Sequence, residues 1–249
     1  MSLNASKPAI SIVTVTFNAD KHLPQLIASL AAQTNKNFEW IVADGASTDN
    51  TLTLIKAINL FSVKVKTEPD SGIYDAMNKA VMRCNGKYYL VLGADDIIYP
   101  NAVNDLLSII NDGNYSFVTS AYNYKNIIVG LSPLPSWYAG PRNSFTGHSV
   151  GTLIKVDLHK KYGFYDTSMK IAADTKFLLI AAKAGESIFF NKTIVGRFAD
   201  TGVSSTQSLN TVFEYFLAQI MTGSNYYIQA VLLFFRLIKR KILNRCNIT

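Results

Sequence analysis

The stretch KYYLVLGADDIIYP, residues 87–100, decides the fold predicted for this chain. Its apolar and aromatic run from Tyr88 to Leu92 has no polar alternation, which is typical of a central strand covered on both faces. Gly93 ends the run, and Asp95 and Asp96 follow at the carboxyl end of the strand, where open α/β sheets place their ligands. Because carboxylate oxygens suit Mg²⁺ or Mn²⁺, the pair predicts a divalent-metal site that serves a phosphorylated substrate.

The composition indicates one folded domain. The chain has 249 residues, of which 49% are hydrophobic and 12% aromatic, enough for a full core in a single large α/β domain. The segment Met1 to Lys7 is polar and has no apolar run, so no secretory signal is expected. The two cysteines, Cys84 and Cys246, form no disulfide framework or paired metal-ligand spacing, which indicates a reducing cytoplasm.

The positive charge is concentrated at one end. The formal net charge is +7, and residues 231–249 carry five basic residues and no acid, which leaves +2 on residues 1–230. A nearly neutral body disfavours nucleic-acid binding, whereas a basic end beside an apolar run predicts contact with an anionic membrane surface. The apolar run, Tyr226 to Phe235, is shorter than the roughly 20 residues that a spanning helix needs. The alternative is a helix that packs on the core with a solvated end.

Strands and helices alternate through the first hundred residues. The predicted strands are Ala9 to Val15, Phe38 to Ala43, Val63 to Thr67 and Tyr88 to Leu92, separated by helices from Leu23 to Gln33, up to Leu60, and from Ile73 to Cys84. This order predicts a parallel sheet with right-handed crossovers. The phosphate-binding patterns Gly-x-Gly-x-x-Gly and Gly-Lys-Ser/Thr are both missing from the sequence, which favours a metal as the holder of phosphate.

The second half is less regular. Its predicted strands are Tyr115 to Ala121, Ile127 to Leu131, Gly151 to Lys155 and Ser187 to Ile194, and its predicted helices are Asn101 to Ile110, Asp157 to Tyr162 and Asp174 to Ala184. A long Pro- and Gly-bearing loop, Ser132 to Gly147, is expected to be functional. From Leu209 onward the sequence predicts two helices broken at Gly223-Ser224-Asn225.

Four sequence blocks together carry a family resemblance: Ser11 to Asn18 (SIVTVTFN), Asp44 to Thr51 (DGASTDNT), Glu68 to Lys79 (EPDSGIYDAMNK) and Leu92 to Asp96 (LGADD). In this order they resemble the family 2 glycosyltransferases, inverting enzymes of GT-A fold in bacterial surface-polysaccharide assembly. The second half matches more loosely, through His148, Gly163 to Asp166, Ile171 to Asp174 and Gly202 to Ser204. The resemblance implies an α/β nucleotide-diphospho-sugar transferase fold with a mainly parallel central sheet and added C-terminal helices.

The resemblance also implies roles for individual residues. Asp95 and Asp96 would form the metal-binding motif for Mn²⁺ or Mg²⁺, with Asp96 the more direct ligand. The residues expected around the base and ribose of the donor are Thr16, Phe17, Asn18 and Asp44. Asp174 would be the base that deprotonates the acceptor hydroxyl. Asp75 would line the donor pocket, although its i, i+4 spacing to Lys79 equally predicts a surface ion pair.

Simpler interpretations stand beside these roles. Asp44 could orient its own turn, Asp174 could cap a helix, and His148 could be structural. The chain departs from many relatives by having Gly45 after Asp44, Ala173 before Asp174 and Ser149 after His148. A serine hydrolase is disfavoured because no Gly-x-Ser-x-Gly is present, and no His/Cys cluster indicates zinc.

The expected protein is a metal-dependent inverting glycosyltransferase with residues 1–208 as the catalytic domain. Residues 1–100 would bind the nucleotide-sugar and residues 101–208 the acceptor, while residues 209–249 would form a basic helical tail. The acceptor is expected to be a polyprenyl-diphosphate-linked saccharide of lipopolysaccharide O-antigen, capsule or exopolysaccharide synthesis, met at the inner face of the bacterial inner membrane. The alternatives are a catalytically silent nucleotide-sugar-binding module and, from the basic pI alone, a nucleic-acid-binding protein.

Overall fold

The structure is a computed structural model that describes residues 7–199 and 209–246, without the side chains of residues 239 and 241–246. Several sequence predictions therefore lie outside the described residues. These are the polar segment at residues 1–6, the Gly202 to Ser204 block, and the side chains of Lys239, Lys241, Arg245 and Cys246.

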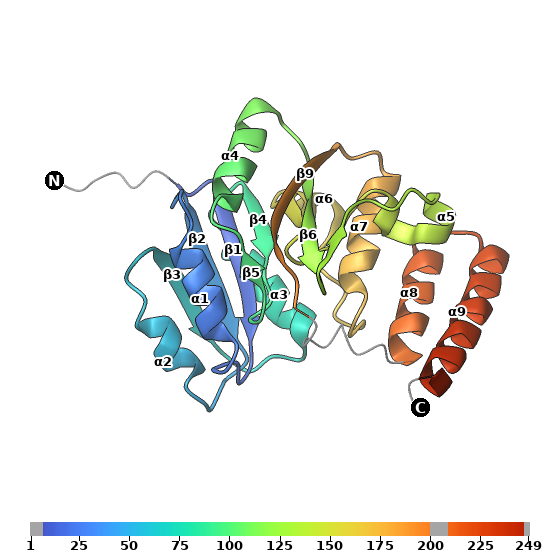
Figure 1. Cartoon of the computed structure of the whole chain (residues 1–249), viewed down its shortest axis with the longest axis horizontal. Coiled ribbons are helices and arrows are strands. Elements are labelled where there is room, and N and C mark those ends of the chain that lie inside the picture. Colours follow the sequence, from blue (N-terminus) through green and yellow to red (C-terminus); the bar gives the residue numbers. More distant parts are fainter. Residues whose placement is uncertain (1–6, 200–208, 247–249) are drawn as a thin grey trace.

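One mixed sheet runs through the described part of the chain (Figure 1). Its strands are β1 (Ile10–Thr16), β2 (Phe38–Asp44), β3 (Ser62–Thr67), β4 (Tyr88–Val91), β5 (Ile97–Ile98), β6 (Phe117–Tyr124), β7 (Ile127–Val129), β8 (Thr152–Lys155) and β9 (Ile188–Arg197). They are ordered β3-β2-β1-β4-β8-β6-β9-β5, with β7 paired to β6. Strands β3, β2, β1 and β4 are parallel, as predicted, whereas β8 pairs antiparallel with both β4 and β6.

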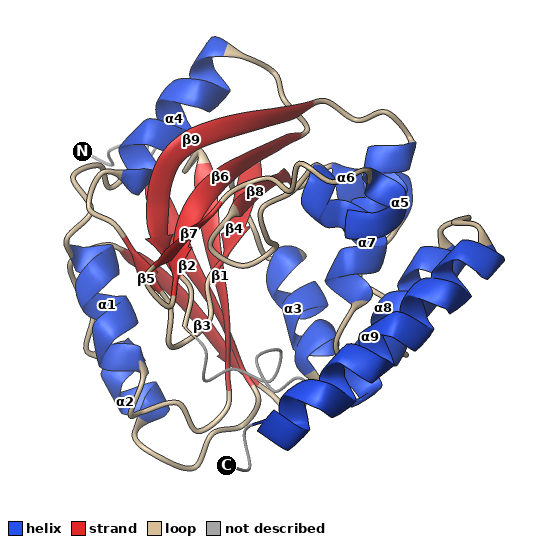
Figure 2. Cartoon of the chain, turned by 45° about the vertical axis from the view of Figure 1, so that its right-hand side comes forward, coloured by secondary structure: helices blue, strands red, loops and turns tan. Residues whose placement is uncertain are grey.

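Helices cover both faces of this sheet (Figure 2). They are α1 (Leu23–Ala31), α2 (Thr51–Lys56), α3 (Ile73–Val81), α4 (Ala102–Asp112), α5 (Ser136–Ala139), α6 (Leu158–Tyr162), α7 (Ala173–Lys183), α8 (Leu209–Met221) and α9 (Tyr226–Cys246), with a 3₁₀ turn η1 (Gly140–Asn143). Helices α1, α2 and α4 pack on one face and α3, α6 and α7 on the other. Helices α8 and α9 lie side by side beyond α7.

The central strands are buried on both sides, as the continuous apolar run of β4 predicted. Tyr88 belongs to the core on the α1 and α4 face, and its neighbour Tyr89 to the core on the α3 and α7 face. Both tyrosines are fully buried, and the Tyr88 hydroxyl donates to the Tyr115 carbonyl at 2.7 Å. Because β4 is buried on both faces of the sheet, its position is fixed, and Gly93 and the acidic turn follow directly from it.

The C-terminal helices have the predicted break. Gly223 has φ 81°, a conformation that glycine adopts without steric cost, and it separates α8 from α9. Helix α9 is fastened to α5 by two contacts: Gln229 Nε2 donates to the Trp137 carbonyl at 2.7 Å, and Arg236 donates to the Tyr138 carbonyl at 3.1 Å. The tail therefore packs against the body of the protein.

Candidate active site

The ends of β1 and β2 bring two of the predicted donor residues together. Thr16 and Asp44 are register partners, and the Thr16 hydroxyl donates to Asp44 Oδ1 at 2.9 Å. Asp44 is buried and also accepts from the Ser47 backbone N–H at 3.0 Å and the Ser47 hydroxyl at 2.5 Å. These bonds hold the loop after β2, as expected for an aspartate that orients its own turn. Contact between Asp44 and a donor stays a prediction.

Asn18 ties the loops after β1 and β2 to each other. Its backbone has φ 47°, and its backbone N–H donates to the Ser47 hydroxyl at 2.9 Å. Its side-chain Oδ1 accepts from the Thr48 backbone N–H at 2.9 Å. Asparagine tolerates this left-handed conformation better than most residues. The preceding residue, Phe17, is 67% exposed beside these loops, and its contact with a nucleobase stays a prediction.

Asp75 is placed differently from the other predicted donor residues. It forms an ion pair with Lys79 at 3.0 Å and accepts from the Ser71 backbone N–H at 2.9 Å. Hydrogen bonding to Ser71 and Lys79 lowers the pKa of this carboxyl. The ion pair is the one that the i, i+4 spacing predicted. Asp75 does not line either of the two cavities described below, and a donor contact for it stays a prediction.

Asp96 is fastened at the end of β4. It is only 1% exposed, and its Oδ2 accepts from the Gly93 backbone N–H at 2.6 Å and the Ser149 hydroxyl at 2.8 Å. Its Oδ1 accepts from the Ala199 backbone N–H at 2.9 Å. Burial raises the pKa of Asp96 to about 6, against the lowering effect of these bonds. Asp96 thus joins the acidic turn to two segments of the second half of the chain.

Asp95 completes the acidic turn, and the two carboxylates gather around Gly93. A Cβ on Gly93 would lie 2.8 Å from Asp95 Oδ1 and 3.1 Å from Asp96 Oδ2, so only glycine leaves room for both. Among the described residues no cluster of three or more His, Cys, Asp and Glu side chains could hold a metal. Mg²⁺ in phosphate sites commonly uses one or two carboxylates and completes its shell with phosphate and water. The pair therefore fits a cation shared with a diphosphate.

Asp174, the predicted base, lies in the first turn of α7 and lines both of the cavities described below. Its Oδ1 accepts from the Thr175 backbone N–H at 2.6 Å and the Tyr74 hydroxyl at 3.0 Å. Its Oδ2 lies 3.8 Å from Nδ1 of His148. The Asp174 charge adds to burial in raising the pKa of Tyr74, so this phenol remains a proton donor. Among the described residues, the hydrogen bonds from Thr175 and Tyr74 thus both go to Oδ1, while Oδ2 faces His148.

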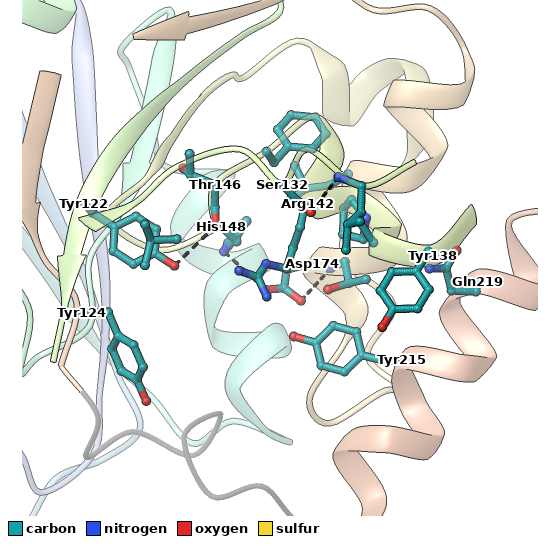
Figure 3. A pocket seen from close by; sticks show the side chains of 18 of the residues that line it. Tyr122, Tyr124, Ser132, Tyr138, Arg142, Thr146, His148, Asp174, Tyr215 and Gln219 are labelled. Atoms are coloured by element: carbon teal, nitrogen blue, oxygen red, sulfur yellow. Dashed lines mark hydrogen bonds and ion pairs between the residues drawn. The ribbon is translucent and has the colours of Figure 1, made fainter. Parts of the chain in front are cut away.

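Two cavities meet at Asp174 and His148. The smaller, of about 150 Å³, is also lined by Asp95, Asp96 and Tyr74. The larger, of about 670 Å³, is lined by four tyrosines and two arginines (Figure 3): Tyr122, Tyr124, Tyr138, Tyr215, Arg142 and Arg236. The segment Ser132 to Gly147, predicted to be a long functional loop, instead contains α5 and η1 and supplies part of this wall; its function stays a prediction. The structure therefore brings Asp174 to the cavity of the adjacent pair Asp95 and Asp96, although Asp174 lies in the other half of the chain.

Sequence reasoning missed the residues that support this centre. Tyr74 and Tyr165 both lie within the blocks of family resemblance, but nothing in a single sequence says what their hydroxyls contact. Ser149 was noted only as a departure from relatives, and it donates to Asp96. The contact of Ser149 with Asp96 spans 53 positions and that of Tyr74 with Asp174 spans 100. Contacts at that separation leave no local pattern in the sequence.

Comparison with known proteins matches these observations. The family model "Glycosyl transferase family 2" matches residues 11–171, which is more than half of the chain. A PGL/p-HBAD biosynthesis glycosyltransferase of Mycobacterium bovis (strain BCG / Pasteur 1173P2) is 42% identical over 95 residues, 37% of this chain and 37% of that protein. An uncharacterized glycosyltransferase of Mycobacterium tuberculosis (strain CDC 1551 / Oshkosh) is 29% identical over 219 residues, 84% of this chain and 81% of that protein. The chain thus matches only about a third of the length of the first of these relatives.

Solved structures share the fold. Residues 1–349 of S. aureus TarS in complex with UDP-GlcNAc superpose with a TM-score of 0.67 at 19% identity, over 90% of this chain and 70% of that one. The mannosyltransferase PcManGT from Pyrobaculum calidifontis, in complex with GDP-Man and Mn²⁺, also gives a TM-score of 0.67 at 15% identity, over 92% of this chain and 69% of that one. The expected GT-A fold is confirmed. With the family model covering residues 11–171, the chain belongs to glycosyl transferase family 2.

Proposed function

We propose that this protein transfers one sugar from a nucleotide-diphosphate donor to a hydroxyl of a saccharide acceptor, with inversion at the anomeric carbon. The observation that carries the proposal is the position of Asp174 on the wall shared by two cavities. One cavity contains the acidic pair Asp95 and Asp96, and the other is aromatic and basic. A base at this junction can reach an acceptor hydroxyl in one cavity while the donor phosphates occupy the other.

The chemistry is a single in-line displacement. Asp174 Oδ2 takes the proton of the acceptor hydroxyl, the acceptor oxygen bonds to the anomeric carbon, and the bond from that carbon to the diphosphate oxygen breaks. Asp95 and Asp96 would hold a divalent cation, whose charge offsets the negative charge of the diphosphate. Thr16, Phe17, Asn18 and Asp44 would border the nucleoside. The nucleotide-sugars bound by the fold neighbours, UDP-GlcNAc and GDP-Man, support this class of donor.

The larger cavity is proposed to bind the acceptor. Tyrosine rings that line a concave site offer apolar faces together with hydroxyl groups, a surface that suits a sugar ring. Arg142 and Arg236 add two guanidinium groups to the same wall. A guanidinium group can bind a phosphate through two parallel N–H···O hydrogen bonds. These features support an acceptor that carries both a saccharide and a diphosphate, as a polyprenyl-diphosphate-linked intermediate of O-antigen, capsule or exopolysaccharide synthesis does.

The C-terminal helices are proposed to contact an anionic membrane surface. Exposed apolar side chains follow one stripe of α9, namely Tyr227, Val231, Phe234, Phe235 and Ile238, and one stripe of α8, namely Leu209, Phe213, Leu217 and Met221. The stripes combine with the net charge of +5 on residues 231–249. No helix in the described part of the chain is both long and apolar enough to cross a bilayer.

Each part of the chain is proposed to have its own role. Residues 1–208 would form the transferase, with residues 1–100 as the donor half and residues 101–208 as the acceptor half. Residues 209–249 would hold the enzyme at the inner face of the membrane. The cavity wall contains residues from both parts, since Arg236 lies on α9 and Asp174 on α7. Docking of the tail would thereby place the acceptor cavity near lipid-linked substrates.

A transfer assay tests the proposal. UDP-, GDP- and dTDP-sugars are incubated with the protein, Mn²⁺ and an extract of lipid-linked saccharides, and release of the nucleoside diphosphate is measured. We expect one donor class to react, and Asp174→Asn to reduce kcat by about 10²- to 10⁴-fold with donor affinity unchanged. If the unaltered protein binds the donor but transfers no sugar, and Asp174→Asn leaves donor binding unchanged, the protein would instead be the nucleotide-sugar-binding module.

A further inference from the structure

A buried chain of side chains leads away from Asp174. It contains His148, Tyr165, Tyr89 and His159, all of which are buried. His148 Nε2 lies 2.7 Å from the Tyr165 hydroxyl, which contacts the Tyr89 hydroxyl, and Tyr89 lies 2.7 Å from His159 Nε2. At the far end, His159 Nδ1 lies 3.1 Å from the carbonyl oxygen of Gly163. The chain thus ends in a group that can only accept a hydrogen bond.

That terminal carbonyl fixes the direction of every hydrogen bond in the chain. His159 must carry its proton on Nδ1, and burial lowers its pKa to about 4, so its Nε2 is an acceptor at neutral pH. Tyr89 therefore donates to His159, and Tyr165 donates to Tyr89. With both phenolic protons used, the Tyr165 oxygen accepts from His148 Nε2.

The direction determines which nitrogen of His148 faces the base. Burial lowers the pKa of His148, so the ring carries one proton, and that proton lies on Nε2. Its Nδ1 consequently presents a lone pair toward Asp174 Oδ2 at 3.8 Å. No described residue donates a hydrogen bond to either of these two atoms. Two proton acceptors face one another at the place where the acceptor hydroxyl has to lose its proton.

We propose that the Tyr165, Tyr89 and His159 chain holds His148 as a proton acceptor opposite the base, and that His148 is a positioning residue for proton transfer. The inference rests on the proposed function. Before the reaction, Nδ1 and Oδ2 share no hydrogen. After Oδ2 has taken the acceptor proton, the new O–H can donate to Nδ1 once the two side chains have closed the present 3.8 Å separation to hydrogen-bond distance. An interaction that forms only as the proton moves lowers the barrier without strengthening ground-state binding.

The opposite tautomer of His148 would make it harder for Asp174 to take up a proton. With its proton on Nδ1, His148 would donate to Asp174 before the reaction and stabilise the carboxylate in its unprotonated form. The hydroxyls of Tyr165 and Tyr89 prevent this arrangement. Tyr74 and Thr175 bind the other oxygen, Oδ1, and so leave Oδ2 directed at His148.

Nitrogen-15 NMR measures the tautomers without requiring activity. The chain has three histidines, and His22 is exposed at the start of α1, so the ring signals can be assigned with His22→Gln and His148→Asn. We expect His148 to show a pyrrole-like Nε2 and a pyridine-like Nδ1, and His159 to show the reverse. A pyrrole-like Nδ1 on His148, or a doubly protonated ring at neutral pH, would overturn the proposal.

Steady-state kinetics test whether the Tyr165 hydroxyl, through His148, affects the rate of sugar transfer. Tyr165→Phe removes the hydroxyl that accepts from His148 and is expected to lower kcat about tenfold with donor KM unchanged. The matched control is Tyr162→Phe, which removes a hydroxyl bonded to Glu186 at 2.6 Å, outside the site.

His148→Asn should lower kcat in the native background and have little further effect in Asp174→Asn, because the two residues act as a unit. Full additivity of the two changes would contradict the proposal. A protein without any transfer but with the expected tautomers would refute the proposed function alone.

Discussion

The phenolic hydroxyl of Tyr74 lies 3.0 Å from Oδ1 of Asp174, across 100 positions of sequence. The same hydroxyl lies 2.7 Å from the carbonyl oxygen of Ile171. Tyr74 belongs to α3 in the first half of the chain and Asp174 to α7 in the second half. The contact therefore fixes the position of the proposed base relative to the donor half.

Tyr74→Phe tests this relationship. The change keeps the ring, which packs against Tyr165 with centroids 5.8 Å apart, and removes only the hydroxyl. We expect the free energy of unfolding to fall by about 1 kcal/mol, as for the loss of one buried hydrogen bond. We also expect kcat to fall about tenfold with donor KM unchanged, because Asp174 loses a group that orients it. An unchanged kcat in steady-state assays would mean that Tyr74 does not orient the base.

Arg142 is predicted to bind the acceptor and not the donor. Figure 3 shows its side chain pointing into the larger cavity, which Asp174 also lines. Arg142→Gln is expected to raise the acceptor KM about tenfold or more, because a charged hydrogen bond contributes about 1.5–3 kcal/mol. Arg142→Lys keeps the charge without the paired geometry and should give an intermediate value. An equal rise in the donor KM, measured in the same assays, would place Arg142 on the donor side instead.

The exposed stripe of α9 predicts a membrane phenotype. Changing Phe234 and Phe235 together to Ser should lower binding to phosphatidylglycerol vesicles by tenfold or more, because each buried aromatic side chain contributes about 1.5–3 kcal/mol. The matched control changes Ile127 and Ile128 together to Ser, an adjacent exposed apolar pair on β7. Donor affinity should stay constant in both variants. Equal vesicle binding by both would contradict membrane docking, and dimerisation that only the Phe changes abolish would assign the stripe to a second copy.

Glu186 predicts how stability depends on pH. Bonds from Lys161, Ser116 and Tyr162 lower its pKa from 4.5 to about 2. The folded state therefore favours the charged carboxylate, and this stability is fully present above pH 4.5 and is lost as the pH falls toward 2. The pair with Lys161 is partly exposed, so the contribution is about 1 kcal/mol or less. In urea unfolding between pH 2 and 6, Glu186→Gln should reduce the slope of stability against pH; an identical slope in the variant would contradict the prediction.

The first half of the fold could be predicted because its signals are local. Strand β2 was expected from Phe38 to Ala43 and extends from Phe38 to Asp44, and its apolar run from Trp40 to Ala43 is continuous and buried. The second half was harder. Strand β5 has only two residues, Ile97 and Ile98, and exists because it pairs with β9 about a hundred positions later. The antiparallel insertion of β8 between β4 and β6 likewise depends on contacts that no local pattern records.

The same limit applies to the site. Asp95, Asp96 and Asp174 could be singled out because each lies within a recognisable block of sequence. Their surroundings could not, since Ser149 and Tyr74 reach them from distant segments. The sequence placed Asp96 as the direct metal ligand, and the structure adds that three hydrogen bonds already hold its carboxylate. Asp96→Asn would therefore alter these bonds as well as any cation contact, so the effect of Asp95→Asn has to be measured beside it.

Calorimetric binding of UDP, GDP and dTDP, with and without Mn²⁺, tests the central claim most directly. The protein is measured intact and as Asp95→Asn and Asp96→Asn, with circular dichroism to confirm that each variant is folded. The account predicts that one nucleotide binds in a Mn²⁺-dependent manner and that Asp95→Asn weakens this binding about tenfold or more, as expected when a cation loses one of two carboxylate ligands. Equally tight binding with and without Mn²⁺ that neither variant alters, or no binding of any nucleotide by the intact protein, would contradict it.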